Sequence, residues 1–90
     1  MTEKQVTIKN RAGIHMRPAG LIAKVASRFV SHISMINEAD NENINAKSIM
    51  GIITLCARYN TTLLVRAEGP DEADAVQAIF DLFEQRFEED

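Results

Sequence analysis

The sequence of 90 residues has no tryptophan, one tyrosine and one cysteine. One cysteine cannot form an internal disulfide, and no Cys/His cluster has the spacing of zinc ligands. No run approaches the roughly 20 apolar residues that span a bilayer, and the first residues lack the apolar core of a secretory signal. These absences predict a soluble, cytoplasmic protein with no metal or other cofactor and no membrane partner.

Positive charge is also in short supply, since 10 Lys and Arg stand against 13 Asp and Glu and the formal net charge is -3. This balance argues against a nucleic-acid binder that relies on phosphate neutralisation. An RNA-binding module is further disfavoured because aromatic residues make up only 6% of the chain and none cluster on a predicted strand. Hydrophobic residues reach 46%, enough for one modest core, and the length predicts one domain over residues 1–90.

Short alternations of apolar and polar residues predict four β-strands, at about residues 4–9, 32–36, 44–46 and 62–67. The polar segment 37–43 joins the second and third strands as a hairpin. Between and after the strands, apolar residues at steps of three and four predict helices.

The predicted helices run from residue 15, 16 or 17 to about 29, over 49–57, and from about 71 to 87. Cys56 is expected to be a small buried hydrophobe, and residues 88–90 a frayed, solvated tail. The order βαββαβα predicts an α+β sandwich with every helix on one face of an antiparallel sheet. A ferredoxin-like topology with an extra helix and an open-faced sandwich with another strand order both fit this order.

Residues 13–19, Gly-Ile-His-Met-Arg-Pro-Ala, stand where the first strand gives way to the first helix. Pro18 suits a first helical turn because it lacks an N–H that would have no intrahelical partner there. His15 is therefore placed at the free amides and positive dipole of a helix start, and Arg17 adds a planar donor fork. These features predict an anion site, and phosphate fits it best.

An imidazole can attack phosphorus directly, so His15 is a candidate phosphoryl acceptor and Arg17 its electrostatic partner. The plain alternative is a polar cap on the surface. General acid–base catalysis would need a second group beside His15, and the neighbouring sequence offers no carboxylate. A self-contained enzyme is therefore disfavoured.

Ser48 precedes a short helix that is apolar almost all round. Its hydroxyl suits an N-cap, and a phosphate added there would lie at the positive end of the helix dipole. Ile49, Met50 and Ile53 are either core residues or part of an exposed docking patch. Lys24 is either part of a basic rim to that patch or a solvated side chain.

Together with residues 45–51, Asn-Ala-Lys-Ser-Ile-Met-Gly, the histidine motif resembles the two phosphorylation signatures of the HPr family. These are the histidine-containing phosphocarrier proteins of the bacterial phosphoenolpyruvate-dependent sugar phosphotransferase system. The resemblance extends over residues 6–87. It implies an open-faced β-sandwich, in which three helices cover one face of a four-stranded antiparallel sheet.

The resemblance also implies roles. His15 would accept a phosphoryl group at Nδ1 from enzyme I and pass it to IIA proteins, with Arg17 and the backbone amides of Met16 and Arg17 holding the phosphate. Ser48 would be the target of an HPr kinase/phosphorylase, and a transcription regulator is a further candidate partner. The implied docking residues are Met16, Gly20, Lys24, Ile49, Met50 and Ile53.

Two departures from the family pattern lie near the histidine: Met16 stands where a small residue is usual, and Ala12 where a small polar one is frequent. Two other functions stay open. One is an HPr-like protein that acts only in regulation. The other is a regulatory small-molecule-binding domain of ferredoxin-like type, which strand order distinguishes.

Overall fold

The structure, a computed structural model, describes residues 1–89. Within them the elements are β1 (Thr2–Thr7), α1 (Met16–Ala26), β2 (His32–Asn37), β3 (Glu42–Asn45), α2 (Ile49–Thr54), β4 (Thr62–Glu68), α3 (Glu72–Glu84) and the short 3-10 helix η1 (Arg86–Glu88). The predicted order βαββαβα is confirmed.

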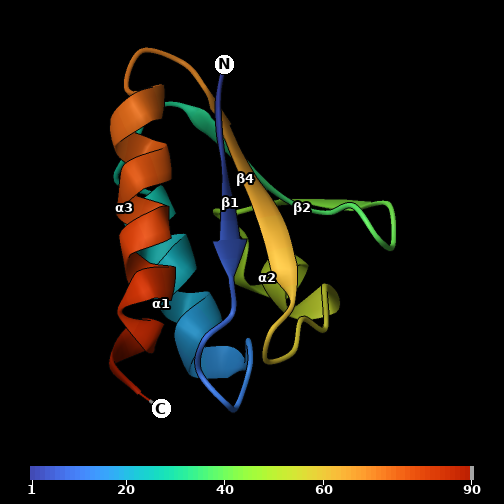
Figure 1. The fold of residues 1–90 in the computed structure, drawn as a ribbon. Helices are drawn as coiled ribbons and strands as arrows, with labels where there is room; N and C mark the ends of the chain where they lie inside the picture. The colour runs from blue at the N-terminus through green and yellow to red at the C-terminus, as the bar shows by residue number, and fades with distance from the viewer. Residues whose placement is uncertain (90) are drawn as a thin grey trace.

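The four strands form a sheet of order β1-β4-β2-β3 with antiparallel pairing throughout (Figure 1). Val6 of β1 pairs with Leu63 of β4, and Val65 of β4 pairs with Met35 of β2. The first and third strands are therefore the edges of the sheet. A ferredoxin-like sheet has these two strands in its centre, so the ferredoxin-like alternative is wrong.

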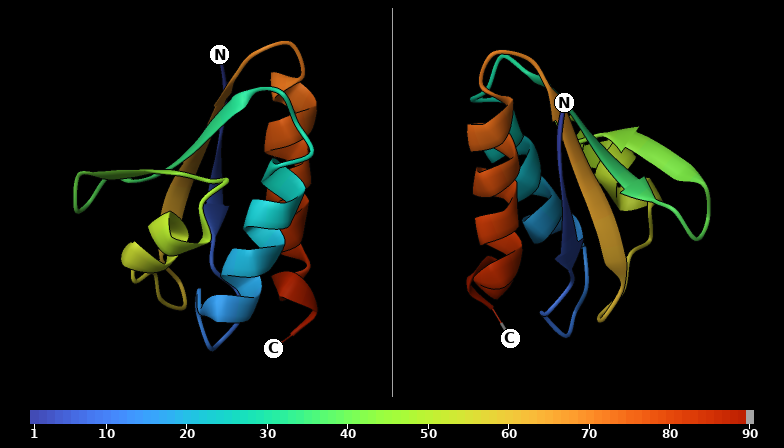
Figure 2. Two further views of the ribbon diagram at one scale, coloured as in Figure 1. Left: turned by 180° about the vertical axis from the view of Figure 1, so that it is seen from behind. Right: turned by 45° about the horizontal axis from the view of Figure 1, so that its top comes forward.

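All three helices lie on one side of the sheet and leave the other side open (Figure 2). Side chains alternate along each strand, so one set enters the layer between sheet and helices. The open face is polar at positions such as Glu3 and Arg66, which form an ion pair across β1 and β4. The predicted open-faced sandwich is confirmed. Its largest fully buried side chains are those of Val6, Ile8, Ile22, Ile33, Met35, Ile52, Leu63, Val65, Val76, Ile79, Phe83 and Phe87.

Two strand boundaries differ from prediction. The first strand begins at Thr2, which pairs with Ala67 of β4, and ends at Thr7, which pairs with Thr62 at the start of β4. The third covers Glu42–Asn45, since Glu42 already pairs with Asn37 in the hairpin. In both cases the cross-strand partner, and not the local alternation, sets the limit.

The second helix ends at Thr54, earlier than predicted. Cys56 then adopts a left-handed conformation with φ of 50° and its side chain is exposed. The prediction that Cys56 is buried is wrong, because the change of backbone hand after the helix turns this residue out of the core. Asn60, in the turn before β4, is also left-handed, a conformation that asparagine tolerates well.

Candidate functional site

His15 is the residue immediately before α1, with an extended backbone (φ −110°, ψ −166°) and a side chain that is 44% exposed. Its carbonyl accepts the hydrogen bond from Ala19 N–H at 3.0 Å that closes the first turn. Pro18 and Ala19 are buried and anchor this end of the helix. The predicted helix start is confirmed, and it presents the imidazole to solvent from a fixed backbone.

The first turn of α1 offers free amide donors next to the histidine. The N–H groups of Met16 and Arg17 have no hydrogen-bond partner among residues 1–89, and the turn contains no acidic residue. Pro18 has no N–H, so these two groups are the donors that the turn leaves open. They lie at the positive end of the helix dipole and can receive an anion.

Glu89 meets both functional side chains of the motif. Its Oε1 lies 3.1 Å from His15 Nε2, and its Oε2 accepts a hydrogen bond from Arg17 NH1 at 3.0 Å. Asn10, which is fully buried, donates through Nδ2 to Glu89 Oε1 at 2.9 Å. The prediction of a frayed tail over residues 88–90 is therefore wrong for Glu89; Asp90 lies outside the described residues.

The contact with Glu89 determines which ring nitrogen of His15 is free. Hydrogen bonds from Asn10 and then from His15 hold the pKa of the Glu89 carboxyl below its usual value, so it is ionised near neutral pH. An ionised carboxylate only accepts hydrogen bonds, and Nε2 must therefore be the donor. In a neutral imidazole the lone pair is then on Nδ1.

A left-handed turn after α3 brings Glu89 to the histidine. Arg86, Phe87 and Glu88 have φ values of 54°, 53° and 60°, a conformation that costs about 1–2 kcal/mol per residue. The turn is held because the Phe87 ring is buried and packs edge-on against Phe83, with centroids 4.9 Å apart. The C-terminal segment consequently ends beside the loop that precedes α1 (Figures 1 and 2).

Arg17 fixes the same turn from the other side. Its NH1 donates to the Phe87 carbonyl at 2.7 Å as well as to Glu89. The Arg17 side chain is 49% exposed and only its NH1 is bonded within residues 1–89, so the guanidinium retains donors for a further ligand. Arg17 is thus a link between the start of α1 and the C-terminal turn.

The loop before His15 is also tied to the segment after α2. Ile14 N–H donates to the Ala57 carbonyl at 3.0 Å, and Gly13 has φ of +74°. A Cβ on Gly13 would lie 2.9 Å from that carbonyl oxygen, so both the space and the backbone conformation favour glycine. This contact connects the histidine motif to the segment that follows α2.

Ser48 is the N-cap of α2, as predicted. Its Oγ accepts a hydrogen bond from Gly51 N–H at 3.0 Å. The residue is partly exposed, and α2 packs against α1. The structure therefore places Ser48 on the neighbouring helix to His15.

The candidate docking residues all lie on α1 and α2. Met16, Met50 and Ile49 are exposed by 63%, 66% and 40%, whereas Ile53 is partly buried against the core. The remaining two are Lys24, which is exposed, and Gly20, where an added Cβ would meet nothing within 4 Å. Ile49 and Met50 are thus exposed and Ile53 packs against the core, while the docking role of these residues stays a prediction.

Sequence reasoning missed Glu89 and Asn10 as parts of this site. The available signal was Phe87: an apolar residue so close to the end of the chain, in step with the buried stripe of α3, must hold the following residues against the protein. In the described range 1–89, no group of three or more His, Cys, Asp or Glu side chains could hold a metal ion. No helix in that range is long and apolar enough to cross a membrane.

Comparison with known proteins gives concordant results. A family model described as the PTS HPr component phosphorylation site matches residues 2–85. Phosphocarrier protein HPr of Treponema pallidum is 47% identical over 90 residues, the whole of both chains. The HPr-like protein Crh of Halalkalibacterium halodurans is 40% identical over 85 residues, 94% of this chain and 99% of its own. The crystal structure of HPr-C-His from Thermoanaerobacter tengcongensis superposes with a TM-score of 0.93 at 43% identity, covering 100% of this chain and 99% of that one.

Proposed function

The chain belongs to the HPr family of phosphocarrier proteins, and from this premise we propose that Nδ1 of His15 is the atom that carries the phosphoryl group. The observation that supports this assignment is the hydrogen bond between His15 Nε2 and Glu89, which leaves the lone pair on Nδ1. Residues 1–90 then act as one HPr-like phosphocarrier domain. A phosphocarrier is a substrate and a donor in transfer, and not a self-contained enzyme.

The transfer step involves one bond made and one broken. The Nδ1 lone pair attacks the phosphorus of the phosphorylated donor as the bond between phosphorus and the donor breaks. The imidazole gains positive charge, which the Glu89 carboxylate opposite Nε2 stabilises. In the reverse sense, Nδ1 leaves phosphorus when the next acceptor attacks, so the same ring serves both halves of the relay.

The phosphoryl oxygens are received by the free amides of Met16 and Arg17 and by the Arg17 guanidinium. Arg17 is bound to Glu89 before transfer, so the incoming group competes with that carboxylate for the same donors. The negative charge of Glu89 also repels the phosphoryl group. Both effects keep the phosphohistidine only moderately stable, as a carrier that must release its group requires.

Its partners are the phosphotransfer proteins of the phosphotransferase system: enzyme I as donor and IIA proteins or domains as acceptors, in the cytoplasm. The exposed apolar residues Met16, Ile49 and Met50 supply the docking surface, with Gly20 and Lys24 beside them on α1. A methionine at position 16 adapts to different partner surfaces because its thioether side chain is flexible.

Ser48 is the regulatory site of this proposal, as the target of an HPr kinase/phosphorylase. A phosphate on Ser48 would place about -1.5 to -2 charges at the start of α2, next to the docking surface. The expected effect is slower transfer to His15 with the fold intact. Ser48→Asp should slow transfer, whereas Ser48→Asn, an N-cap without charge, should not; equal rates for both variants and the unmodified protein would argue against this role.

The acceptor assignment is tested with phosphoenolpyruvate and a competent enzyme I. The protein should gain the mass of one phosphate in an acid-labile, base-stable form, and His15→Ala should gain none. His32→Ala is the matched control, since His32 is an exposed histidine on β2 and should not affect labelling. Retention of the label in His15→Ala would disprove the assignment. Transfer from the labelled protein to a IIA component separates a carrier from a protein that acts only in regulation.

A further inference from the structure

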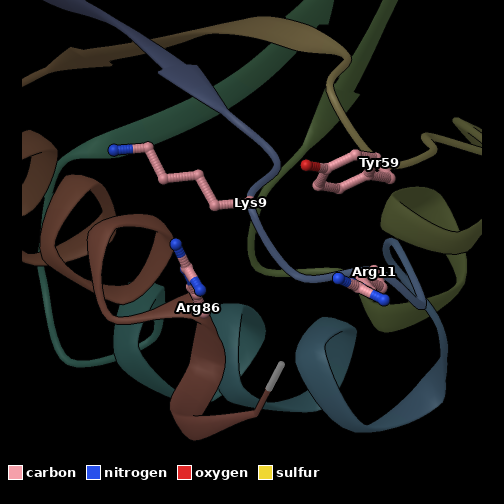
Figure 3. A pocket seen from close by; sticks show the side chains of 4 residues that line it. All are labelled: Lys9, Arg11, Tyr59 and Arg86. Carbon is pink, nitrogen blue, oxygen red and sulfur yellow. The ribbon is translucent and has the colours of Figure 1, made fainter.

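A cavity of about 410 Å³ lies between three segments of the chain and is lined by Lys9, Arg11, Tyr59 and Arg86 (Figure 3). Lys9 and Arg11 come from the loop between β1 and α1, Tyr59 from the turn before β4, and Arg86 from η1. The lining shares no residue with the histidine motif or with the Ser48 motif. Three of its four side chains are cationic.

The three cations differ in how they are paired. Lys9 Nζ lies 2.7 Å from Glu84 Oε2, and Figure 3 shows the ammonium directed away from Tyr59 and Arg11. The guanidinium groups of Arg11 and Arg86, by contrast, form no salt bridge or side-chain hydrogen bond with any of residues 1–89. The cavity therefore has two guanidinium charges that the described chain does not neutralise.

The backbone that carries these side chains is fixed. The turn around Arg11 is closed by the hydrogen bond from Gly13 N–H to the Asn10 carbonyl at 3.1 Å. Asn60, next to Tyr59, donates through its N–H to the Ile8 carbonyl at 2.8 Å. Arg86 begins the left-handed turn that the buried Phe87 ring anchors. The three lining segments are therefore held by backbone hydrogen bonds and by the buried Phe87 ring.

The chemistry of the lining selects the ligand class. Two planar guanidinium forks with a phenol hydroxyl match the tetrahedral oxygens of a phosphate better than a single carboxylate. Figure 3 shows Tyr59 and Arg11 on one side of the cavity and Arg86 on the other, with the Tyr59 hydroxyl directed toward the space between them. The volume falls within the 300–1,000 Å³ typical of small-molecule sites.

We propose that the cavity between Arg11, Tyr59 and Arg86 is a binding site for a small soluble phosphate monoester. The site is separate from the phosphoryl acceptor, and the inference does not depend on the role of His15. Its ligand would join the loop that precedes the histidine to the C-terminal turn that carries Glu89.

The test is a titration of the ¹⁵N-labelled protein with glycerol 3-phosphate at constant ionic strength, followed by amide shifts, with glycerol as the uncharged analogue. Saturable shifts are expected at residues 11, 59 and 86 with the ester alone. The double variant Arg11→Gln/Arg86→Gln should bind at least about tenfold more weakly, the effect of losing charge-assisted hydrogen bonds. Arg28→Gln is the matched control, an exposed arginine beyond the other end of α1, and should bind as the unmodified protein does.

A second variant distinguishes this site from the histidine motif. If the ester binds at the start of α1 instead, the saturable shifts will lie at residues 15–17 and Arg17→Gln will abolish them, which would overturn the proposal. Equal binding by the double variant and by Arg28→Gln, or shifts that never saturate, would overturn it as well. The readout involves no phosphoryl transfer, so neither result bears on the acceptor assignment.

Discussion

Replacing Glu89 with glutamine removes one charge from the site and keeps the shape of the side chain. The Glu89 carboxylate accepts hydrogen bonds from the exposed side chains of Arg17 and His15 and from the buried Asn10. The pair with Arg17 joins side chains that are 49% and 23% exposed, and solvent screening limits it to about 0.5 kcal/mol. The hydrogen bond from Asn10 Nδ2 then goes to an uncharged acceptor, which costs roughly a further 0.5–1 kcal/mol. The expected loss in free energy of unfolding is therefore about 1–1.5 kcal/mol.

Urea denaturation at pH 7 measures this loss. Glu88→Gln is the matched control, because Glu88 is the exposed neighbouring residue with the same charge, and it should change the free energy by less than about 0.5 kcal/mol. Equal stabilities of the two variants would refute the reasoning. The pKa of Glu89 is lowered in the folded protein from its ordinary value of 4.5. The difference in free energy of unfolding between the two variants should therefore be largest above pH 4.5, and it should vanish as pH falls through the lowered pKa of Glu89.

A second substitution at Glu89 tests which tautomer the His15 ring adopts. If the Glu89 bond is worth about 1 kcal/mol to the Nε2–H form, removing it in Glu89→Ala changes the tautomer ratio about fivefold. Imidazole ¹⁵N chemical shifts of His15 measure that ratio. An unchanged ratio would show that Glu89 does not determine the free nitrogen.

Two further predictions concern the ends of the chain. Phe87→Ala removes a fully buried ring that packs on Phe83. It should lower the free energy of unfolding by about 3 kcal/mol or more, as measured by urea denaturation. It should also weaken the Glu89 contacts, which a change in the amide chemical shift of His15 would report. Glu72 receives hydrogen bonds from the N-terminal amine and Thr2, which lower its pKa from 4.5 to about 2, so it stabilises the fold above pH 4.5 and less as pH falls toward 2. Glu72→Gln should remove that part of the pH dependence of stability, and a curve unchanged from that of the unmodified protein would contradict it.

The sequence was sufficient for the order of elements and for the two motifs, because both are local. Pro18 marks the start of α1 whatever the rest of the chain does, and Ser48 is followed at once by the helix it caps. The strand order was beyond this reasoning because it depends on contacts between distant segments. The burial of Cys56 was predicted wrongly for a related reason. Its small apolar side chain suits the core, but its backbone conformation is set by how α2 ends.

Glu89 shows the largest difference between sequence and structure. Nothing local distinguishes it from Glu88, and its contacts span more than 70 positions of the chain, to Asn10, His15 and Arg17. Its placement follows from the burial of Phe87 and the left-handed turn around that residue. A site described from the motif alone contained a histidine and an arginine; the fold adds the carboxylate that orients the ring and competes for the arginine.

The central claim is that the phosphoryl group is carried on Nδ1 of His15, and its position can be measured directly. The protein, labelled with ¹⁵N at histidine, is phosphorylated with phosphoenolpyruvate and enzyme I, and the ring nitrogens are examined by NMR. We expect coupling to phosphorus at Nδ1 of His15, with the proton retained on Nε2. A phosphoryl group on Nε2, or on any residue other than His15, would contradict the account.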